Sequence, residues 1–162
     1  VPTLRLNAMA LIPPFERSDW QAALQDMAPE VQSEWLTPPS WFEPDMAKRE
    51  VRFQKYSIEM VGRMHKAGVP IGAGTDTPIG MAIPGYSLHN ELAFLVRAGL
   101  TPLEALKSAT IRPAEFLNLE NQMGTIEVGK VADLVLLSAN PLEDIGNTRK
   151  IELVISKGNL VD

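Results

Sequence analysis

Residues 69–77 read Val-Pro-Ile-Gly-Ala-Gly-Thr-Asp-Thr, and this stretch decides the fold class. Its first half is a short apolar run of the kind that forms a buried parallel strand, and the glycines then allow a tight turn. In barrels and open α/β sheets, catalytic groups lie at the carboxyl ends of strands. Asp76 follows the expected strand at 69–73, so it is the best candidate for a catalytic carboxylate. The alternative is that Asp76 only stabilises the turn, as aspartate often does.

A long helix is expected directly before this strand. Hydrophobic residues recur at helical spacing over residues 45–67, and Gly68 is well suited to end the helix. We expect the large hydrophobic side chains on this helix to be core residues rather than a cofactor-binding face. These residues are Phe53, Tyr56, Met60 and Met64.

Further helices are expected after the strand. Ser87 can cap a helix that ends at Gly99, and Thr101-Pro102-Leu103-Glu104 has the pattern of a capping box with proline in the first turn. Pro113 opens another short helix. A helix, a strand and then more helices are typical of βα architecture.

Residues 1–44 form a proline-rich segment with two short helical patterns. Ser18 can cap the first helix, whose hydrophobic face contains Trp20, Ala23, Leu24 and Met27, and the second runs through Val31 and Trp35. The many large rings favour a compact covering segment, such as a lid over a site; an ordinary packed surface insertion is the alternative. The start, Val1-Pro2-Thr3-Leu4, has no initiator methionine, and we expect it to be a cut or processed end.

In residues 124–162 the spacing of the hydrophobic residues changes from helical to strand-like. Short β-branched or apolar runs at 125–128, 132–137 and 153–156 predict strands of a small antiparallel or mixed β unit. Gly129-Lys130 and Lys157-Gly158-Asn159 supply turns between them. So few strands bury little surface alone and need a partner sheet.

Composition narrows the possible functions. The 162 residues include 20 acidic and 15 basic side chains, a net charge of −5, which argues against a nucleic-acid partner. No apolar stretch approaches the ~18–20 residues that span a bilayer, so no membrane partner is expected. The absence of cysteine excludes disulfides and thiolate metal sites and fits a reducing compartment such as the cytoplasm. The sequence leaves open whether a signal peptide precedes Val1.

Several stretches together resemble the amidohydrolase superfamily. They are Gly74-Thr75-Asp76, Ser87-Leu88-His89-Asn90-Glu91-Leu92, Ala98–Leu106 followed by Ala109-Thr110, Gly124–Val135, Asn140-Pro141-Leu142 and Val154–Gly158. Their order and spacing are most similar to the imidazolonepropionase-like and prolidase-like enzymes. The resemblance implies a (β/α)8 barrel that holds one or two divalent metals, usually zinc, and a β-sandwich built from both chain ends. It also implies hydrolysis of a C–N bond by metal-activated water, with Asp76 as metal ligand and proton shuttle, acting on a small amide or dipeptide-like substrate.

The chain is too short for that whole architecture. A barrel alone takes roughly 250 residues, and the His-x-His motif of the family is missing because His65 and His89 are 24 positions apart. We therefore expect the C-terminal part of an α/β barrel enzyme: strand 8, possible strand 7 at Val1–Leu4, their helices and part of a β-sandwich. The expected divisions are a covering segment at 1–44, a partial barrel at 45–123 and a sandwich portion at 124–162. Such a chain should bind no metal and be inactive by itself, and it should self-associate where the missing barrel half would pack.

The sequence allows more than one role for several other polar residues. His89 resembles a family position that can touch substrate, but a structural hydrogen bond is equally compatible with the sequence. His65 is expected at the surface and Asp133 in a structural turn, while Asn7 could face the site. The alternative function is a non-catalytic α/β assembly or interaction domain that reuses the C-terminal half of an amidohydrolase.

Overall fold

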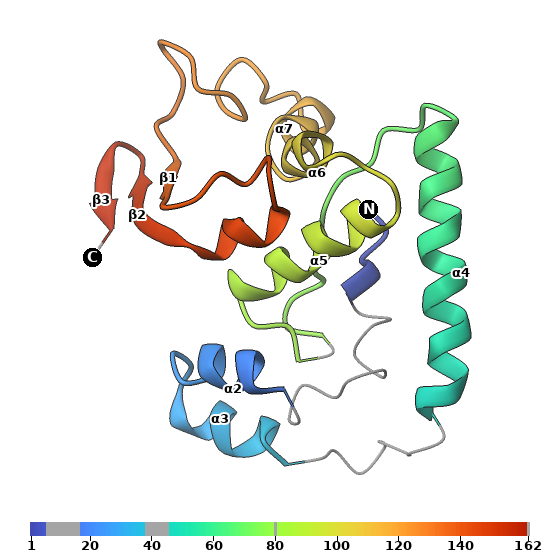
Figure 1. Ribbon diagram of the computed structural model, residues 1–162. Helices are drawn as coiled ribbons and strands as arrows, with labels where there is room; N and C mark the ends of the chain where they lie inside the picture. The colour runs from blue at the N-terminus through green and yellow to red at the C-terminus, as the bar shows by residue number, and fades with distance from the viewer. Residues whose placement is uncertain (6–16, 38–45, 80, 162) are drawn as a thin grey trace.

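Helices dominate the chain, and its strands gather near the carboxyl terminus (Figure 1). The computed structural model describes residues 1–5, 17–37, 46–79 and 81–161, so Asn7 lies outside the described residues. The element order confirms an α/β chain with one small sheet. The elements are α2 (Ser18–Leu24), α3 (Pro29–Trp35), α4 (Met46–Lys66), α5 (Tyr86–Arg97), α6 (Pro102–Ser108), α7 (Ile111–Phe116), β1 (Leu134–Leu137), the 3-10 helix η2 (Ile145–Arg149), β2 (Ile151–Ser156) and β3 (Asn159–Val161).

Helix α5 lies at the centre of the main hydrophobic core. Its Leu92 and Leu95 are buried against hydrophobic side chains of α4, α6, η2 and the N-terminal segment. The predicted capping box starts α6 as expected: Thr101 Oγ1 accepts a hydrogen bond from the Glu104 amide at 3.2 Å, and Glu104 Oε2 accepts one from the Thr101 amide at 2.8 Å. This cap satisfies amides that the first helical turn leaves unpaired, and it fixes where α6 begins.

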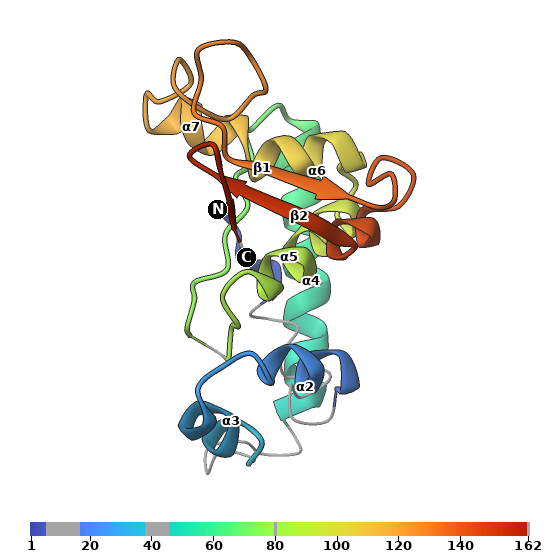
Figure 2. The ribbon, with the colours of Figure 1, turned by 90° about the vertical axis from the view of Figure 1, so that its left-hand side faces the viewer.

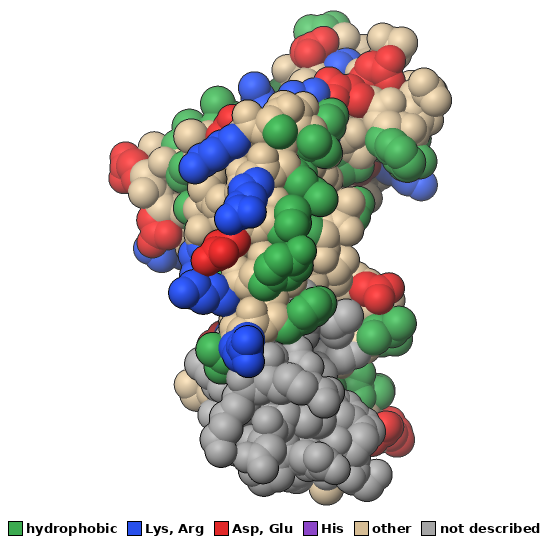
Figure 3. Space-filling model, turned by 90° about the vertical axis from the view of Figure 1, so that its right-hand side faces the viewer, with side chains coloured by type: hydrophobic (Ala, Val, Ile, Leu, Met, Phe, Trp, Pro, Cys, Tyr) green, Lys and Arg blue, Asp and Glu red, His purple; other side chains and the backbone are tan. Residues whose placement is uncertain are grey.

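The expectation for the face of α4 is wrong for most of its residues. Phe53 and Tyr56 are 53% and 56% exposed, and Met64 is exposed too. Figure 3 shows hydrophobic side chains gathered in a stripe on one face of the molecule. Phe53, Tyr56 and Met64 fall on one side of α4 at helical spacing, and we call these exposed residues the α4 stripe. The face that α4 does bury contains Gln54 and Val61, because that side turns toward the core around α5. None of the helices in the described ranges is long and apolar enough to cross a membrane.

The strand expected at 69–73 is not part of a sheet. Residues 69–76 carry no regular secondary structure, although the Ala73 amide donates to the Ser108 carbonyl at 2.8 Å. A strand exists only through a ladder of hydrogen bonds to a neighbour, and the described residues place no such ladder beside this segment. Val1 lies against it: an ideal Cβ on Gly72 would come within 3.3 Å of Val1 Cγ2. The N-terminal segment and residues 72–74 therefore run close together.

The C-terminal residues form a three-stranded antiparallel sheet in the order β1-β2-β3. Leu134 pairs with Ile155, and Val154 pairs with Val161. The predicted turn at Lys157-Gly158 is confirmed, since both residues have positive φ angles (49° and 80°), as in the tight turns typical of hairpins.

The strand expected at 125–128 is absent. Residues 125–128 form bends, turn and irregular chain, with Ile126 and Val128 almost fully exposed. The β-branched run predicted a strand, but its side chains have no described surface to pack against, and strand propensity depends on such packing.

Helices α2 and α3 lie at the end of the molecule away from the sheet (Figure 2). As expected, Trp20 and Leu24 are buried on one face of α2, where they pack with Ile83. Trp35 stacks on Trp20 with ring centroids 6.0 Å apart. These contacts form a second, smaller hydrophobic cluster.

The two serine caps were predicted incorrectly. Ser18 is the first residue of α2, its N-cap is Arg17, and no side chain caps the helix. Helix α5 begins at Tyr86 after Gly85, and the Ser87 hydroxyl instead accepts a hydrogen bond from the Ile83 amide at 2.9 Å. The burial of Ser87 explains the difference, because its hydroxyl stabilises the turn that enters the helix.

Candidate active site

Asp76 lies in an exposed loop directly after the segment at 69–73. Its φ angle of +54° is in the left-handed region, which aspartate tolerates better than most residues. The Ile79 amide donates to the Asp76 carbonyl at 2.8 Å, and the hydroxyls of Thr75 and Thr77 lie 2.7 Å apart. The loop is thus a tight turn whose carboxylate reaches solvent, where it can accept a proton or bind a cation.

Arg5 holds this loop from below the surface. The residue is buried, and its Nε donates to the Thr75 carbonyl at 2.9 Å while Nη2 donates to the Ile79 carbonyl at 2.5 Å. Burial lowers the pKa of the Arg5 guanidinium, and the negative charges of Glu91 and Asp76 oppose that shift. Arg5 therefore interacts electrostatically with the candidate catalytic carboxylate.

Glu91 is the partner of Arg5 on helix α5. It is fully buried, and its Oε2 accepts a hydrogen bond from the Arg5 amide at 2.7 Å. Burial raises the pKa of the Glu91 carboxyl, although the amides of Arg5 and Leu4 and the charge of Arg5 act against this rise. Sequence reasoning missed both residues. One signal was present, because Glu91 interrupts the apolar face formed by Leu88, Leu92 and Leu95.

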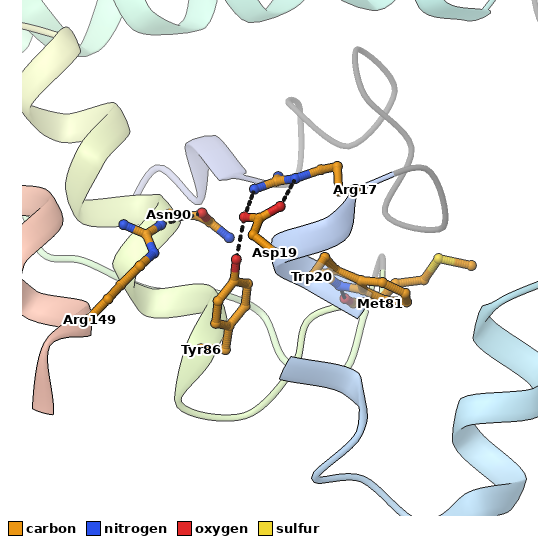
Figure 4. Close-up of polar contacts among 7 residues, drawn as sticks. All are labelled: Arg17, Asp19, Trp20, Met81, Tyr86, Asn90 and Arg149. Carbon is orange, nitrogen blue, oxygen red and sulfur yellow. Dashed lines mark hydrogen bonds and ion pairs between the residues drawn. The ribbon is translucent and has the colours of Figure 1, made fainter. Parts of the chain in front are cut away.

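His89 contacts the 3-10 helix. Its Nδ1 lies 3.0 Å from Thr148 Oγ1, whose hydroxyl donates to the Ile145 carbonyl, so Nδ1 carries the proton in this contact. Burial, helped by the charge of Arg149, lowers the pKa of His89. Arg149 also donates to Asn90 Oδ1 at 2.7 Å (Figure 4). A substrate-binding role for His89 stays a prediction beside this structural contact.

A polar network joins α2 to the loop that follows Asp76. Figure 4 shows Asp19 between Arg17, which donates to it at 2.6 Å, and the Tyr86 hydroxyl, which also donates to it. Burial would raise the pKa of Asp19, but the hydrogen bonds from Arg17 and Tyr86 outweigh it and lower this pKa to about 2. Trp20 Nε1 donates to the Met81 carbonyl at 3.2 Å. Residues 17–37 therefore pack on the chain between Asp76 and α5.

His65 and Asp133 make contacts outside the Asp76 loop. His65 is half-buried, with Nε2 3.5 Å from Glu104 Oε1, beside a cavity of about 190 Å³ at the start of the 69–71 segment. Asp133 Oδ1 accepts a hydrogen bond from the Lys157 amide at 2.7 Å, in the structural turn expected for it.

The described residues do not by themselves fit a metal ion. A catalytic zinc site normally needs three protein ligands, and within the described ranges no three His, Asp or Glu side chains lie close enough to hold one. Arg5, whose charge interacts with that of Asp76, is a cation rather than a metal ligand. Any metal at Asp76 would need ligands from outside the described part of this chain.

Comparison with known proteins shows strong similarity to hydrolases. The chain is 44% identical over 82 residues to an ochratoxinase of Aspergillus niger, an alignment that covers 49% of this chain and 16% of that enzyme. It is 33% identical over 107 residues to the imidazolonepropionase of Thermoplasma acidophilum, covering 61% and 25% of the two chains. Its structure resembles a prolidase solved in complex with N-methylphosphonate-L-proline, with 32% identity, a TM-score of 0.62 and coverage of 88% and 33%.

The chain spans about a third or less of the length of each of these relatives. The solved amidohydrolase structures that it resembles imply a TIM-barrel-type fold. The amidohydrolase family profile matches residues 46–161, which include Asp76, α5 and the whole sheet. This chain therefore belongs to the amidohydrolase family.

Proposed function

We propose that this chain is the C-terminal part of a metal-dependent amidohydrolase that hydrolyses a non-peptide or cyclic-amide C–N bond. The observation that carries the proposal is the exposed Asp76 carboxylate in the loop that follows residues 69–73, within the family match. Catalytic groups of barrel enzymes lie at the ends of strands. Residues 69–73 would be strand 8. Of the strand 7 expected at Val1–Leu4, only Val1–Thr3 could be the end, because Leu4 and Arg5 are helical; Val1 approaches the 69–73 segment.

The missing neighbours explain why these segments form no sheet here. In the whole protein the earlier strands of the barrel would supply the hydrogen-bond ladder that residues 69–73 lack. The sheet β1-β2-β3 would form part of a β-sandwich completed by sequence outside this chain.

Asp76 would act as a proton shuttle. As a water oxygen bonds to the carbonyl carbon of the substrate, an Oδ atom of Asp76 would take the water proton and pass it to the leaving nitrogen as the C–N bond breaks. A divalent metal, which we expect to be zinc, supplies the positive charge that acidifies water in such enzymes. It would be held by Asp76 together with ligands outside this chain.

The substrate class follows from the relatives. A prolidase with a phosphonate derivative of L-proline and an imidazolonepropionase both favour small amide, cyclic-amide or dipeptide-like substrates over macromolecules. Residues 17–37 pack beside the loop that follows Asp76, which supports a covering role over the site. His89 would then bind the substrate from the α5 side of the site.

The test uses the longer protein that contains this chain. Asp76→Asn should lower kcat by about 10²–10⁴-fold against small amides, the range expected when a proton-transfer group is removed. Glu59→Gln, which changes an exposed carboxylate on α4, should leave kcat unchanged. Metal content is measured by mass spectrometry of the purified protein.

Two results obtained with the longer protein would contradict the proposal. One is an active protein in which Asp76→Asn has full activity. The other is a whole protein that holds no metal and hydrolyses no amide, which would favour the assembly domain. The isolated chain should retain no stoichiometric metal, and tight metal binding with turnover in this chain alone would also overturn the fragment proposal.

A further inference from the structure

A buried polar cluster joins three parts of the chain that are far apart in sequence. Arg5 lies near the N-terminus, its side chain binds the loop at 75–79, and its amide binds Glu91 of α5. Arg5 and Glu91 are 86 positions apart and both are buried. Buried charged groups are costly unless each is paired and hydrogen-bonded. We therefore looked for a specific role of these two residues beneath the Asp76 loop, in addition to their part in the core.

The guanidinium of Arg5 binds both sides of Asp76. It contacts the Thr75 carbonyl directly before the aspartate and the Ile79 carbonyl three residues after it, at 2.9 and 2.5 Å. A guanidinium is planar and rigid, so one side chain that binds two carbonyls fixes their separation. Asp76 has a φ of +54°, and a non-glycine residue keeps such a conformation only where its surroundings enforce it.

Glu91 fixes Arg5 in turn. Its Oε2 accepts from the Arg5 amide at 2.7 Å, so the carboxylate holds the backbone from which the Arg5 side chain extends. Its Oε1 has no hydrogen-bond partner among the described residues. Helix α5 carries Glu91 in the centre of the core, beside Leu92 and Leu95, and thus provides a rigid base.

We propose that Arg5 and Glu91 are positioning residues that hold the Asp76 loop in its observed conformation, with Glu91 acting through Arg5. The catalytic use of that conformation rests on the proposed function, but the positioning itself does not. Both side chains are buried, whereas Asp76 itself is exposed.

The first test measures backbone order by NMR in the chain, diluted until it sediments as a monomer. Order parameters of the Thr75, Asp76 and Thr77 amides should be near ~0.85 in the wild type and fall below ~0.6 in Arg5→Gln. Arg5→Lys should give intermediate values, since an ammonium is a point charge without the two-pronged geometry. Val61→Ala, which weakens the same core from α4, should leave these three amides ordered.

The second test asks whether an acceptor oxygen at position 91 is sufficient to hold Arg5, without the negative charge of Glu91. Glu91→Gln keeps an oxygen that can accept from the Arg5 amide, so loop order should be retained, whereas Glu91→Ala should loosen the loop as Arg5→Gln does. An Arg5→Gln loop as ordered as the wild-type loop would overturn the proposal. If Arg5→Gln does not unfold cooperatively, and so is not properly folded, Arg5→Lys becomes the deciding variant. Wild-type loop order in Arg5→Lys would then overturn the proposal.

Kinetics in the longer protein provide a separate readout. Arg5→Lys should lower kcat about tenfold and change KM less than twofold, because the loop loses its orientation while the substrate contacts stay. An inactive wild-type protein would count against the proposed function alone, since the order parameters are independent of activity. A disordered loop with unchanged kcat would overturn the catalytic part of this inference.

Discussion

Gly124 shows how much a single residue depends on its neighbours in space. It has a φ of +95°, and an ideal Cβ there would lie 2.9 Å from Ile111 Cα and 3.0 Å from Ala114 Cβ. Gly124→Ala should therefore lower the free energy of unfolding by roughly 2–5 kcal/mol, from left-handed strain of about 1–2 kcal/mol and overpacking of about 1–3 kcal/mol. Urea denaturation of the purified chain measures this loss.

Gly129 provides the matched control at the same scale. Its φ is +93°, but a Cβ there would meet nothing within 4 Å. Gly129→Ala should cost only the strain, about 1–2 kcal/mol. Equal losses in the two variants would contradict the contact between Gly124 and α7. The sequence shows two similar turn glycines, and only the packing of α7 distinguishes them.

At the scale of elements, the contact between α2 and α5 should depend on pH. Asp19 has a pKa lowered from 3.8 to about 2, so its contribution to stability is present above pH 4 and is lost as the pH falls through 2. Tyr86→Phe removes one hydrogen bond to Asp19 and should raise the pKa of this carboxyl toward its ordinary value. Because Asp19 is half exposed, the expected loss of unfolding free energy at neutral pH is only ~0.2–1 kcal/mol.

Denaturation followed by tryptophan fluorescence measures this effect, since Trp20 lies on α2. The difference between Tyr86→Phe and the wild type should shrink between pH 4 and pH 2. Tyr56→Phe on the exposed α4 stripe should show no such trend. A difference that is constant from pH 7 to pH 2 would mean that Asp19 and Tyr86 are not linked.

Helices and strands differ in how far sequence could predict them. Helix α4 and the capping box of α6 followed from local spacing, because helical hydrogen bonds and caps lie within a few residues. The segments at 69–73 and 125–128 have strand-like composition but form no strand. A strand needs a lateral partner from elsewhere in the chain or the protein, and composition does not show whether one is present.

For the whole molecule, the exposed apolar surfaces should cause self-association. The α4 stripe and the outer strands β1 and β3 leave hydrophobic side chains uncovered in the described structure. Sedimentation velocity should show the wild-type chain associating as its concentration rises. The double variant Phe53→Lys, Tyr56→Lys should remain monomeric to higher concentration, because two charges interrupt the stripe.

Gln25→Lys with Ser33→Lys is the matched control, since it adds the same two charges at exposed positions, one directly after α2 and one on α3, away from the stripe. This control should associate as the wild type does. A wild-type chain that stays monomeric at the highest concentration reached would instead favour a closed, independent domain.

The sequence alone determined the family and predicted the loop that carries Asp76, because ordered motifs and glycine-rich turns are local patterns along the chain. It also predicted the helices from hydrophobic spacing, and the start of α6 from its capping box, although the serine caps of α2 and α5 were wrong. Only the tertiary structure showed that Arg5 and Glu91 support the Asp76 loop and that His89 contacts Thr148. These contacts join residues 59 to 86 positions apart. Their hydrogen bonds depend on how the core brings distant segments together, which local spacing does not encode.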